Sequence, residues 1–134
     1  MASNLKYAVA TKNAKLNQIS SQIGASGLLS IYSGTQPTNP DTGLSGNTLL
    51  AQLACSVTFA PNAAGGVLTA NPITTETSAN ATGTAAWGSL TTSGGTRIVD
   101  FSVGTSGADL NINTTSIVAG AQVAVSALTI TSAN

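Results

Sequence analysis

Four side chains in the second half of the chain come closest to a pattern that could bind an ion. Asp109, Asn111 and Asn113 alternate along a stretch with strand periodicity, so their oxygens lie on one face, and Asp100 precedes them. Such oxygens suit Ca²⁺, but the stretch lacks the glycine at the sixth position and the closing glutamate of a calcium loop. We favour a polar strand face whose oxygens accept hydrogen bonds from neighbouring backbone groups, and predict no metal site.

Nucleophilic catalysis has equally little support. The chain has no histidine, so the commonest general base is missing and the serines have no partner to activate them. Cys55 falls on the apolar side of an alternating stretch, where burial raises the pKa of a thiol. The glycine-rich stretches Gly94–Gly95 and Gly104–Gly107 neither open a helix nor carry the lysine of a phosphate-binding loop, so we predict turns there. We expect no catalytic residue, no enzymatic activity and no cofactor.

Charge is scarce and unevenly placed. Charged residues make up 6% of the chain, against about 25% in a typical soluble protein. Lys6, Lys12 and Lys15 all precede Asp41, the first acidic residue. These charges are too few for a nucleic-acid-binding surface. We expect an ordinary solvated helix face; the alternative is a basic arm that meets an acidic neighbouring subunit.

Aromatic side chains are also few, namely Tyr7, Tyr32, Phe59, Trp87 and Phe101. Binding of single-stranded nucleic acid needs exposed aromatics in a basic groove, and the sequence offers too few of either. We expect most of the five in the core. For Tyr32 and Trp87 a subunit interface is the alternative, since such residues are enriched there.

Composition indicates one domain with an uncharged polar surface. The 134 residues are enough for one modest core, and 42% of them are hydrophobic. Serine and threonine number 36, so hydroxyl groups replace charge at the surface. Low charge is also typical of a protein that packs against neighbours, where charged groups would lose their hydration. We find no apolar run near the roughly 18 residues of a membrane span, and no signal-peptide pattern.

Periodicity predicts one helix, from Thr11 to Ile23. Leu16 and Ile19 share an apolar stripe with Ile23, and that stripe must dock on the rest of the chain because so short a helix is marginal alone. Thr11 is expected to cap the first turn, and Gly24 to end the helix in a left-handed conformation.

Short β segments with turns between them follow the helix. The predicted strands cover residues 29–31, 49–59, 67–73, 82–90, 99–103, 109–113 and 123–130. The predicted strand over residues 49–59 is long enough that we expect a bend or bulge in it. Within residues 123–130 the apolar residues change from one alternating phase to the other, which predicts a bulge near Ser126. Ser93–Gly95 predicts a hairpin turn, and Leu110 and Ile112 are expected to face the core.

This pattern predicts an all-β fold, an antiparallel β-sandwich or jelly-roll-like domain or a small barrel, with one short N-terminal helix. We assign residues 1–26 to an N-terminal arm and helix, and residues 27–134 to the β-sandwich domain.

Six segments spread over the sequence carry a family resemblance: Asn13–Leu16, Ile31–Pro37, Leu49–Leu53, Gly66–Ala70, Ala81–Trp87 and Gly104–Ile117. Together they resemble a family of small structural proteins from the virions of tailed bacteriophages. In that family an arginine and a variable loop follow the tryptophan, whereas Gly88, Ser89 and Leu90 follow it here. The resemblance implies a virion component.

With the β fold, the missing catalytic set and the low charge, we expect a capsid decoration (cement) protein that clamps major capsid subunits. Its partners would be the major capsid protein and further copies of itself in a homotrimer, with no nucleic acid and no membrane. It would be made in the bacterial host cytoplasm and lie on the capsid surface of the virion. The alternatives are a tail, collar or head–tail adaptor protein, and a carbohydrate- or calcium-binding β-sandwich.

Overall fold

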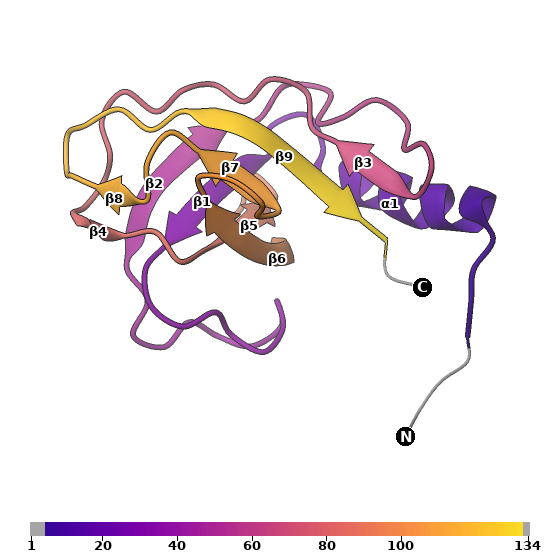
Figure 1. Cartoon of the computed structure of the whole chain (residues 1–134), viewed down its shortest axis with the longest axis horizontal. Helices are drawn as coiled ribbons and strands as arrows, with labels where there is room; N and C mark the ends of the chain where they lie inside the picture. Colours follow the sequence, from indigo (N-terminus) through magenta and orange to yellow (C-terminus); the bar gives the residue numbers. More distant parts are fainter. Residues whose placement is uncertain (1–4, 133–134) are drawn as a thin grey trace.

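The structure is a computed structural model that describes residues 5–132. In this part of the chain the elements are α1 (Val9–Ile23), β1 (Leu28–Tyr32), β2 (Leu49–Ala54), β3 (Val67–Thr69), β4 (Gly83–Thr84), β5 (Trp87–Thr91), β6 (Arg97–Gly104), β7 (Leu110–Ile112), β8 (Ser116–Ile117) and β9 (Val125–Thr131) (Figure 1). Residues 1–4 of the predicted N-terminal arm and residues 133–134 of the predicted β domain lie outside the described residues.

Within residues 5–132, seven strands form one mixed sheet in the order β2-β1-β5-β6-β7-β9-β3, and β4 pairs with β8 in a separate ribbon. A mainly-β fold with a short N-terminal helix is therefore confirmed. The expectation that all strands pair antiparallel is wrong, because β6 and β7 run parallel over Val103–Gly104 and Leu110–Asn111.

A tight loop produces this parallel pair. Residues 105–109 join β6 to β7, although parallel neighbours usually need a crossover of a dozen or more residues. Gly107 adopts φ +70°, and the Asp109 carboxylate accepts hydrogen bonds from the main-chain N–H (3.2 Å) and the hydroxyl (3.0 Å) of Ser102. The Asp109 side chain thereby bonds the end of the loop to β6. The chain reverses direction once in a hairpin, but here it turns back a second time, so that β7 runs in the same direction as β6.

α1 begins two residues earlier than predicted. Its N-cap is Ala8, whose carbonyl accepts the N–H of Lys12 (3.0 Å), and no side chain caps the first turn. Thr11 therefore lies inside the helix, and its predicted capping role is wrong. The helix ends where predicted, since Gly24 donates its N–H to the Ser20 carbonyl. Gly24 has a positive φ of +74°, but its ψ of −163° differs from the predicted left-handed helical conformation.

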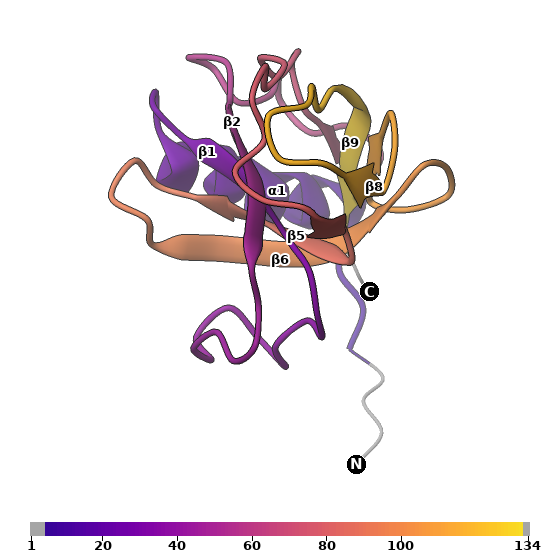
Figure 2. The ribbon, with the colours of Figure 1, turned by 90° about the vertical axis from the view of Figure 1, so that its left-hand side faces the viewer.

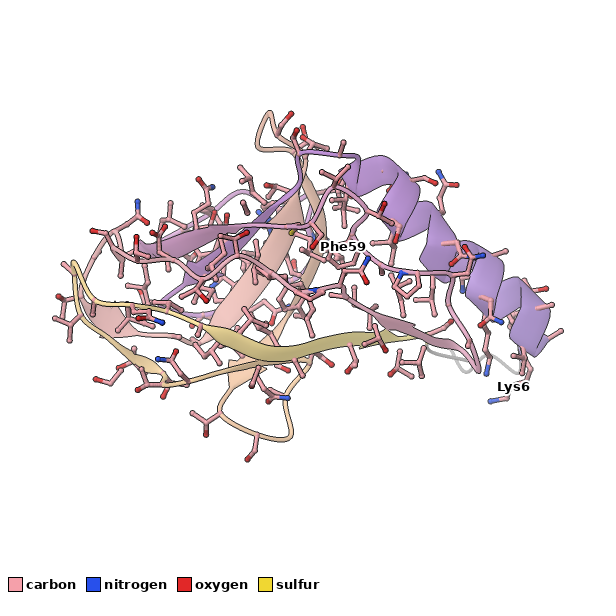
Figure 3. The ribbon with its side chains drawn as sticks, turned by 90° about the horizontal axis from the view of Figure 1, so that it is seen from above. Lys6 and Phe59 are labelled. Carbon is pink, nitrogen blue, oxygen red and sulfur yellow. The ribbon has the colours of Figure 1, made fainter. Side chains whose placement is uncertain are left out.

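The apolar stripe of α1 packs into the same core as the strands. Leu16 and Ile23 are buried, and Ile19 is partly buried against them, which confirms the predicted stripe. Figure 3 shows Lys6 at the edge of the molecule, beside the start of the helix, and Phe59 inside the body of the molecule.

β2 is shorter than the predicted strand over residues 49–59. It ends at Ala54, and the chain then bends so that Val57 is 76% exposed. Alternation over residues 49–59 places Val57 and Phe59 on one face of a strand, but Val57 is exposed whereas Phe59 is buried. The expected irregularity is present, because the register of β2 against β1 skips Leu50.

Several local predictions in the second half are confirmed. Ser93–Gly95 lies in the turn between β5 and β6, and residues 105–107 of the predicted turn Gly104–Gly107 belong to the loop after β6, while Gly104 is the last residue of β6. The register of β9 against β7 skips Ser126, which is the extra residue of the predicted bulge. Leu110 and Ile112 are buried in the core.

Two other predicted strands are shorter than expected. The strand over residues 67–73 ends at Thr69, before Pro72. The strand over residues 82–90 is divided into β4 and β5, because the chain passes from the two-stranded ribbon to the large sheet before Trp87.

The four strands β2, β1, β5 and β6 have an apolar inner face and a polar outer face. Leu29, Leu53 and Leu90 are paired across neighbouring strands and buried on the inner face. The alternate residues, among them Ser30 and Ser89, point to the outer face. Figure 2 shows these four strands together, with α1 behind them.

Candidate functional site

The predicted polar strand residues do not assemble into an ion site. Asp109 is exposed and bonded to Ser102, while Asn111 and Asn113 each accept a main-chain N–H, at 3.1 and 3.0 Å. The Asp100 side chain instead forms an ion pair with Arg97. Within residues 5–132, no three Asp, Glu, Cys or His side chains are grouped so as to hold a metal ion. The favoured interpretation, oxygens that bond to neighbouring backbone, is confirmed for Asn111, Asn113 and Asp109.

Cys55 lies just beyond β2 as a half-buried free thiol. Desolvation by burial raises the pKa of this thiol to about 11. The nucleophilic form is the thiolate, which is a small fraction at neutral pH when the pKa is this high. The predicted rise in the pKa of this thiol is borne out, and the absence of a catalytic role for Cys55 stays a prediction.

Four of the five aromatic side chains are buried, namely Tyr32, Phe59, Trp87 and Phe101. Phe59 and Phe101 belong to the hydrophobic core as expected, whereas Tyr32 and Trp87 are buried on the outer face of the sheet. Tyr7 instead lies beside the start of α1, where the Lys15 ammonium sits 3.9 Å from its ring centre. Tyr32 and Trp87 stack with ring centres 4.6 Å apart and planes inclined by 17°.

Hydroxyl and amide groups form a row across the outer face. Ser30 and Ser89 are buried neighbours across the β1–β5 pair. Gln52 donates to the Ser30 hydroxyl (3.2 Å), and the Ser89 hydroxyl donates to a β6 carbonyl (3.3 Å). The indole N–H of Trp87 and the hydroxyl of Thr91 are buried on this face and have no hydrogen-bond partner in the described part of the chain.

The strongest interaction on the outer face is an ion pair within β6. Arg97 Nε lies 3.2 Å from Asp100 Oδ1, and Nη2 contacts Oδ2, so the guanidinium holds both carboxylate oxygens. The two side chains are only 11% and 2% exposed. The β5–β6 register skips Ile98, and this bulge brings side chains three residues apart onto one face. The hydrogen bond to Asp100 raises the pKa of Arg97, against burial, which lowers it.

Arg97 also holds the connection between β1 and β2, residues 33–48, which we call the clamp loop. Its guanidinium donates to the main-chain carbonyls of Thr42 (2.6 Å) and Asn39 (3.2 Å). Its central carbon lies 5.4 Å from the centre of the Trp87 ring. One cation therefore joins β6, the aromatic stack and the clamp loop. Figures 1 and 2 show this loop projecting from the rest of the domain.

Two asparagines hold the clamp loop from within. Asn39 Oδ1 accepts the main-chain N–H groups two and three residues further on, both at 3.0 Å. Asn47 Nδ2 donates to the carbonyls of Ser33 (2.9 Å) and Thr35 (3.0 Å). The clamp loop thus has a defined internal structure in addition to its attachment to Arg97.

A hollow of about 270 Å³ lies within the clamp loop. Thr35, Gln36, Thr38, Ser45 and Asn47 are among its walls, and none of the lining side chains is ionisable. These groups donate and accept hydrogen bonds without transferring protons at neutral pH. The exposed surface of the hollow is nevertheless mostly apolar, so the hollow suits contact with an uncharged surface, and its lining residues contain no acid–base pair.

Arg97 was not a predicted site residue, since the sequence presented it only as one of four basic residues. The available signal was its closeness to Asp100 in a chain with so few charges. A regular strand would have placed these two side chains on opposite faces, so recognising the pair required knowledge of the bulge.

Comparison with known proteins yields no match: no family model, curated protein or solved structure corresponds to this chain. Over the described residues, no helix has the length and apolar character that crossing a membrane requires.

Proposed function

We propose that the protein is a non-enzymatic structural protein of a tailed-bacteriophage virion, a decoration protein that lies on the capsid surface and clamps major capsid subunits. The observation that carries the proposal is that the buried Arg97–Asp100 pair holds a projecting loop in place. A loop fixed at its base by a rigid sheet is a typical contact surface. The resemblance of six segments to phage virion proteins supplies the virion setting.

The chemistry of the clamp loop supports a contact with another protein. Asp41 is its only ionisable residue, and Leu44 is 46% exposed. Covering this loop with a capsid subunit would therefore desolvate one charge and bury apolar surface. Protein synthesis in the bacterial cytoplasm, self-association as a homotrimer and binding to the major capsid protein complete the proposal.

Add-back to stripped virions tests the cement role. Virions freed of the protein should lose resistance to heat and osmotic shock, and added protein should restore it. Leu44→Lys places a charge in the contact and should fail to restore resistance. Val118→Lys is the matched control, because Val118 is 54% exposed outside the clamp loop. Stripped virions with full resistance, or equal rescue by both variants, would contradict the proposal.

Copy number separates the shell from the tail, collar or head–tail adaptor. Quantitative mass spectrometry of purified virions should find hundreds of copies if the protein decorates the shell. About a dozen copies or fewer would indicate a ring-shaped assembly at the tail or the portal end.

The hollow in the clamp loop supports a second candidate function, binding of a carbohydrate. Its walls combine hydroxyl and amide groups with an exposed surface that is mostly apolar, and a neutral sugar makes both kinds of contact. Glycan titration by calorimetry, with melting temperature as a second readout, tests this function. If the protein does not bind carbohydrate, calorimetry will detect no heat of binding and the melting temperature will not change. Calcium is not carried forward, because the oxygens of Asn111 and Asn113 already accept hydrogen bonds from the chain.

The sandwich or jelly-roll form of the fold is part of the same proposal. In its support, Leu53 of β2 and Leu68 of β3, at opposite ends of the strand order, belong to one hydrophobic core. The division into an arm with its helix (1–26) and a β domain (27–134) stays a prediction.

A further inference from the structure

The large sheet is interrupted between β6 and β9. β7 lies between these strands, but it pairs with β6 only at Val103 and Gly104. The preceding residues of β6 pair with β5 on one side, and no described strand pairs with their other side. A cavity of about 180 Å³ lies at this interruption, lined by residues 99–101 of β6, Asp109 and residues 129–131 of β9. We call this cavity the notch.

The β6 wall of the notch offers main-chain groups. Along a strand, the N–H and C=O groups of alternate residues point to the same side. The N–H of Ser102 points away from β5, since it donates to the Asp109 carboxylate (3.2 Å). Asp100, two residues earlier, therefore directs its own N–H and C=O away from β5 and into the notch.

The β9 wall offers main-chain groups from the other side. The Leu128 carbonyl and the Ser132 N–H form hydrogen bonds toward β3, at 3.0 and 2.9 Å. The N–H of Thr129 instead donates to the Asp109 carbonyl (3.1 Å), on the opposite side of the strand. Thr131 has the same orientation as Thr129, so the carbonyls of both residues and the N–H of Thr131 face the notch.

Hydrogen-bond acceptors outnumber main-chain donors in the notch. Asp109 is exposed at its rim, and Oδ2 of this carboxylate accepts both hydrogen bonds from Ser102, which leaves Oδ1 available. The carbonyls of Asp100, Thr129 and Thr131 add to this oxygen, whereas the main-chain donors are the N–H groups of Asp100 and Thr131. The lining residues include no basic side chain. The notch therefore favours a cation that donates several hydrogen bonds.

The shape of the notch favours a guanidinium group. β9 rises steeply from β6 (Figure 2), so the two walls suit one side-chain group better than an extended segment that would have to follow both. A guanidinium presents its N–H donors along several edges of one plane, and it can donate to the rim carboxylate and to a wall carbonyl at once. The cavity has room for several water molecules, and so for a group of this size. Val99 and Ile130 also line it and provide apolar contact for the stem of a long side chain.

We propose that the notch binds an arginine side chain of a different protein. The chain has one arginine, Arg97, whose side chain is 11% exposed and bonded to Asp100 and the clamp loop. A second copy can therefore offer only lysines. Guanidinium is more weakly hydrated than ammonium, so entry into a cavity costs it less, and arginine is enriched at protein interfaces. This site lies outside the clamp loop and does not depend on the proposed function.

Titration with blocked amino acids tests the class of ligand. N-acetyl-arginine amide and N-acetyl-lysine amide carry the two side chains at equal charge, and nuclear magnetic resonance follows the main-chain amides of the isotope-labelled full chain. We expect the arginine probe to shift the amide signals of Asp100 and Thr131 to saturation, with an affinity about fivefold above that of the lysine probe. Equal affinities, no saturable shift, or shifts confined to residues outside the notch would overturn the proposal.

Two carboxylate variants locate the contact. Asp109→Asn removes the charge but keeps an oxygen that can accept the hydrogen bonds from Ser102, and it should bind the arginine probe about fivefold more weakly. Asp41→Asn is the matched control, because Asp41 is also exposed but does not line the notch, and its affinity should be unchanged. Equal binding by the two variants would overturn the proposal. If Asp109→Asn fails to fold, the comparison of the two probes on the unchanged chain still decides.

Free L-arginine separates a partner protein from a small-molecule ligand. Its carboxylate would lie near that of Asp109, so we expect the free amino acid to bind no more tightly than the blocked arginine probe. Tighter binding of free arginine would assign the notch to the amino acid itself and overturn the proposal of a partner protein. These readouts need no virion, so they fail independently of the cement role.

Discussion

Arg97 and Asp100 lie three residues apart in one strand, yet their side chains meet on the same face because the register against β5 skips Ile98. Each side chain is nearly buried, so each relies on the other to offset the loss of its hydration. The remaining donors of Arg97 bind carbonyls of the clamp loop. The pair therefore connects the stability of the sheet to the position of the loop that we propose as the contact surface.

Asp100→Ala should lower the free energy of unfolding by about 3 kcal/mol, because it leaves the Arg97 guanidinium buried without its carboxylate. Urea unfolding measures the change. Asp41→Ala is the control, since Asp41 is exposed in the clamp loop, and it should change stability by no more than about 0.5 kcal/mol. Equal effects of the two substitutions would mean that the pair contributes no net stability.

Cys55 should alkylate slowly at pH 8 and faster as the pH approaches 11, the pKa of its thiol in the folded protein. The unfolded thiol, with a pKa of about 8.5, loses its proton first. The stability linked to the neutral thiol is thus complete below about pH 8.5 and lost as pH rises toward 11. Cys55→Ala should remove this part of the pH dependence. Alkylation at pH 8 as fast as in a short peptide would refute the raised pKa.

Gly107→Val should destabilise the fold by about 1–2 kcal/mol. Gly107 has φ +70°, which costs a residue with a side chain, and a Cβ there would meet nothing within 4 Å. Backbone conformation alone is therefore tested. Gly43→Val is the control, because Gly43 also has open space but lacks a positive φ. Thermal unfolding compares the melting temperatures of the two variants. Equal melting temperatures would show that the predicted backbone strain at Gly107 is absent.

Asn17→Ala should cost about 1 kcal/mol, although alanine favours helices. Asn17 Oδ1 accepts the N–H of Ala63 at 2.7 Å and so attaches α1 to the turn before β3. Gln18→Ala, on an exposed position of the same helix, should leave stability unchanged or raise it slightly. Chemical denaturation compares the two. A variant at Asn17 as stable as the one at Gln18 would show that this hydrogen bond does not hold the helix.

Local patterns predicted the features that depend on neighbouring residues. Gly24 ends the helix, Ser93–Gly95 forms the hairpin turn, and Ser126 is the bulged residue, because each signal lies within one turn or one strand. The burial of Leu110 follows likewise from strand periodicity.

Features that depend on a distant partner were not predictable in this way. Alternation places Val57 on the apolar face of the predicted strand, but the chain bends after β2 and exposes it. The sequence of β6 alone does not identify Ile98 as a bulged residue, because the bulge is defined by the pairing of β6 with β5.

The sequence by itself determined a nearly uncharged, mainly-β chain with one helix, no histidine and one poorly reactive cysteine. Only the tertiary structure decided that Arg97 meets Asp100 and that β6 and β7 run parallel. The physical reason is that period and turn chemistry act over a few residues, whereas register, strand direction and unpaired edges arise from pairing between segments far apart in the chain.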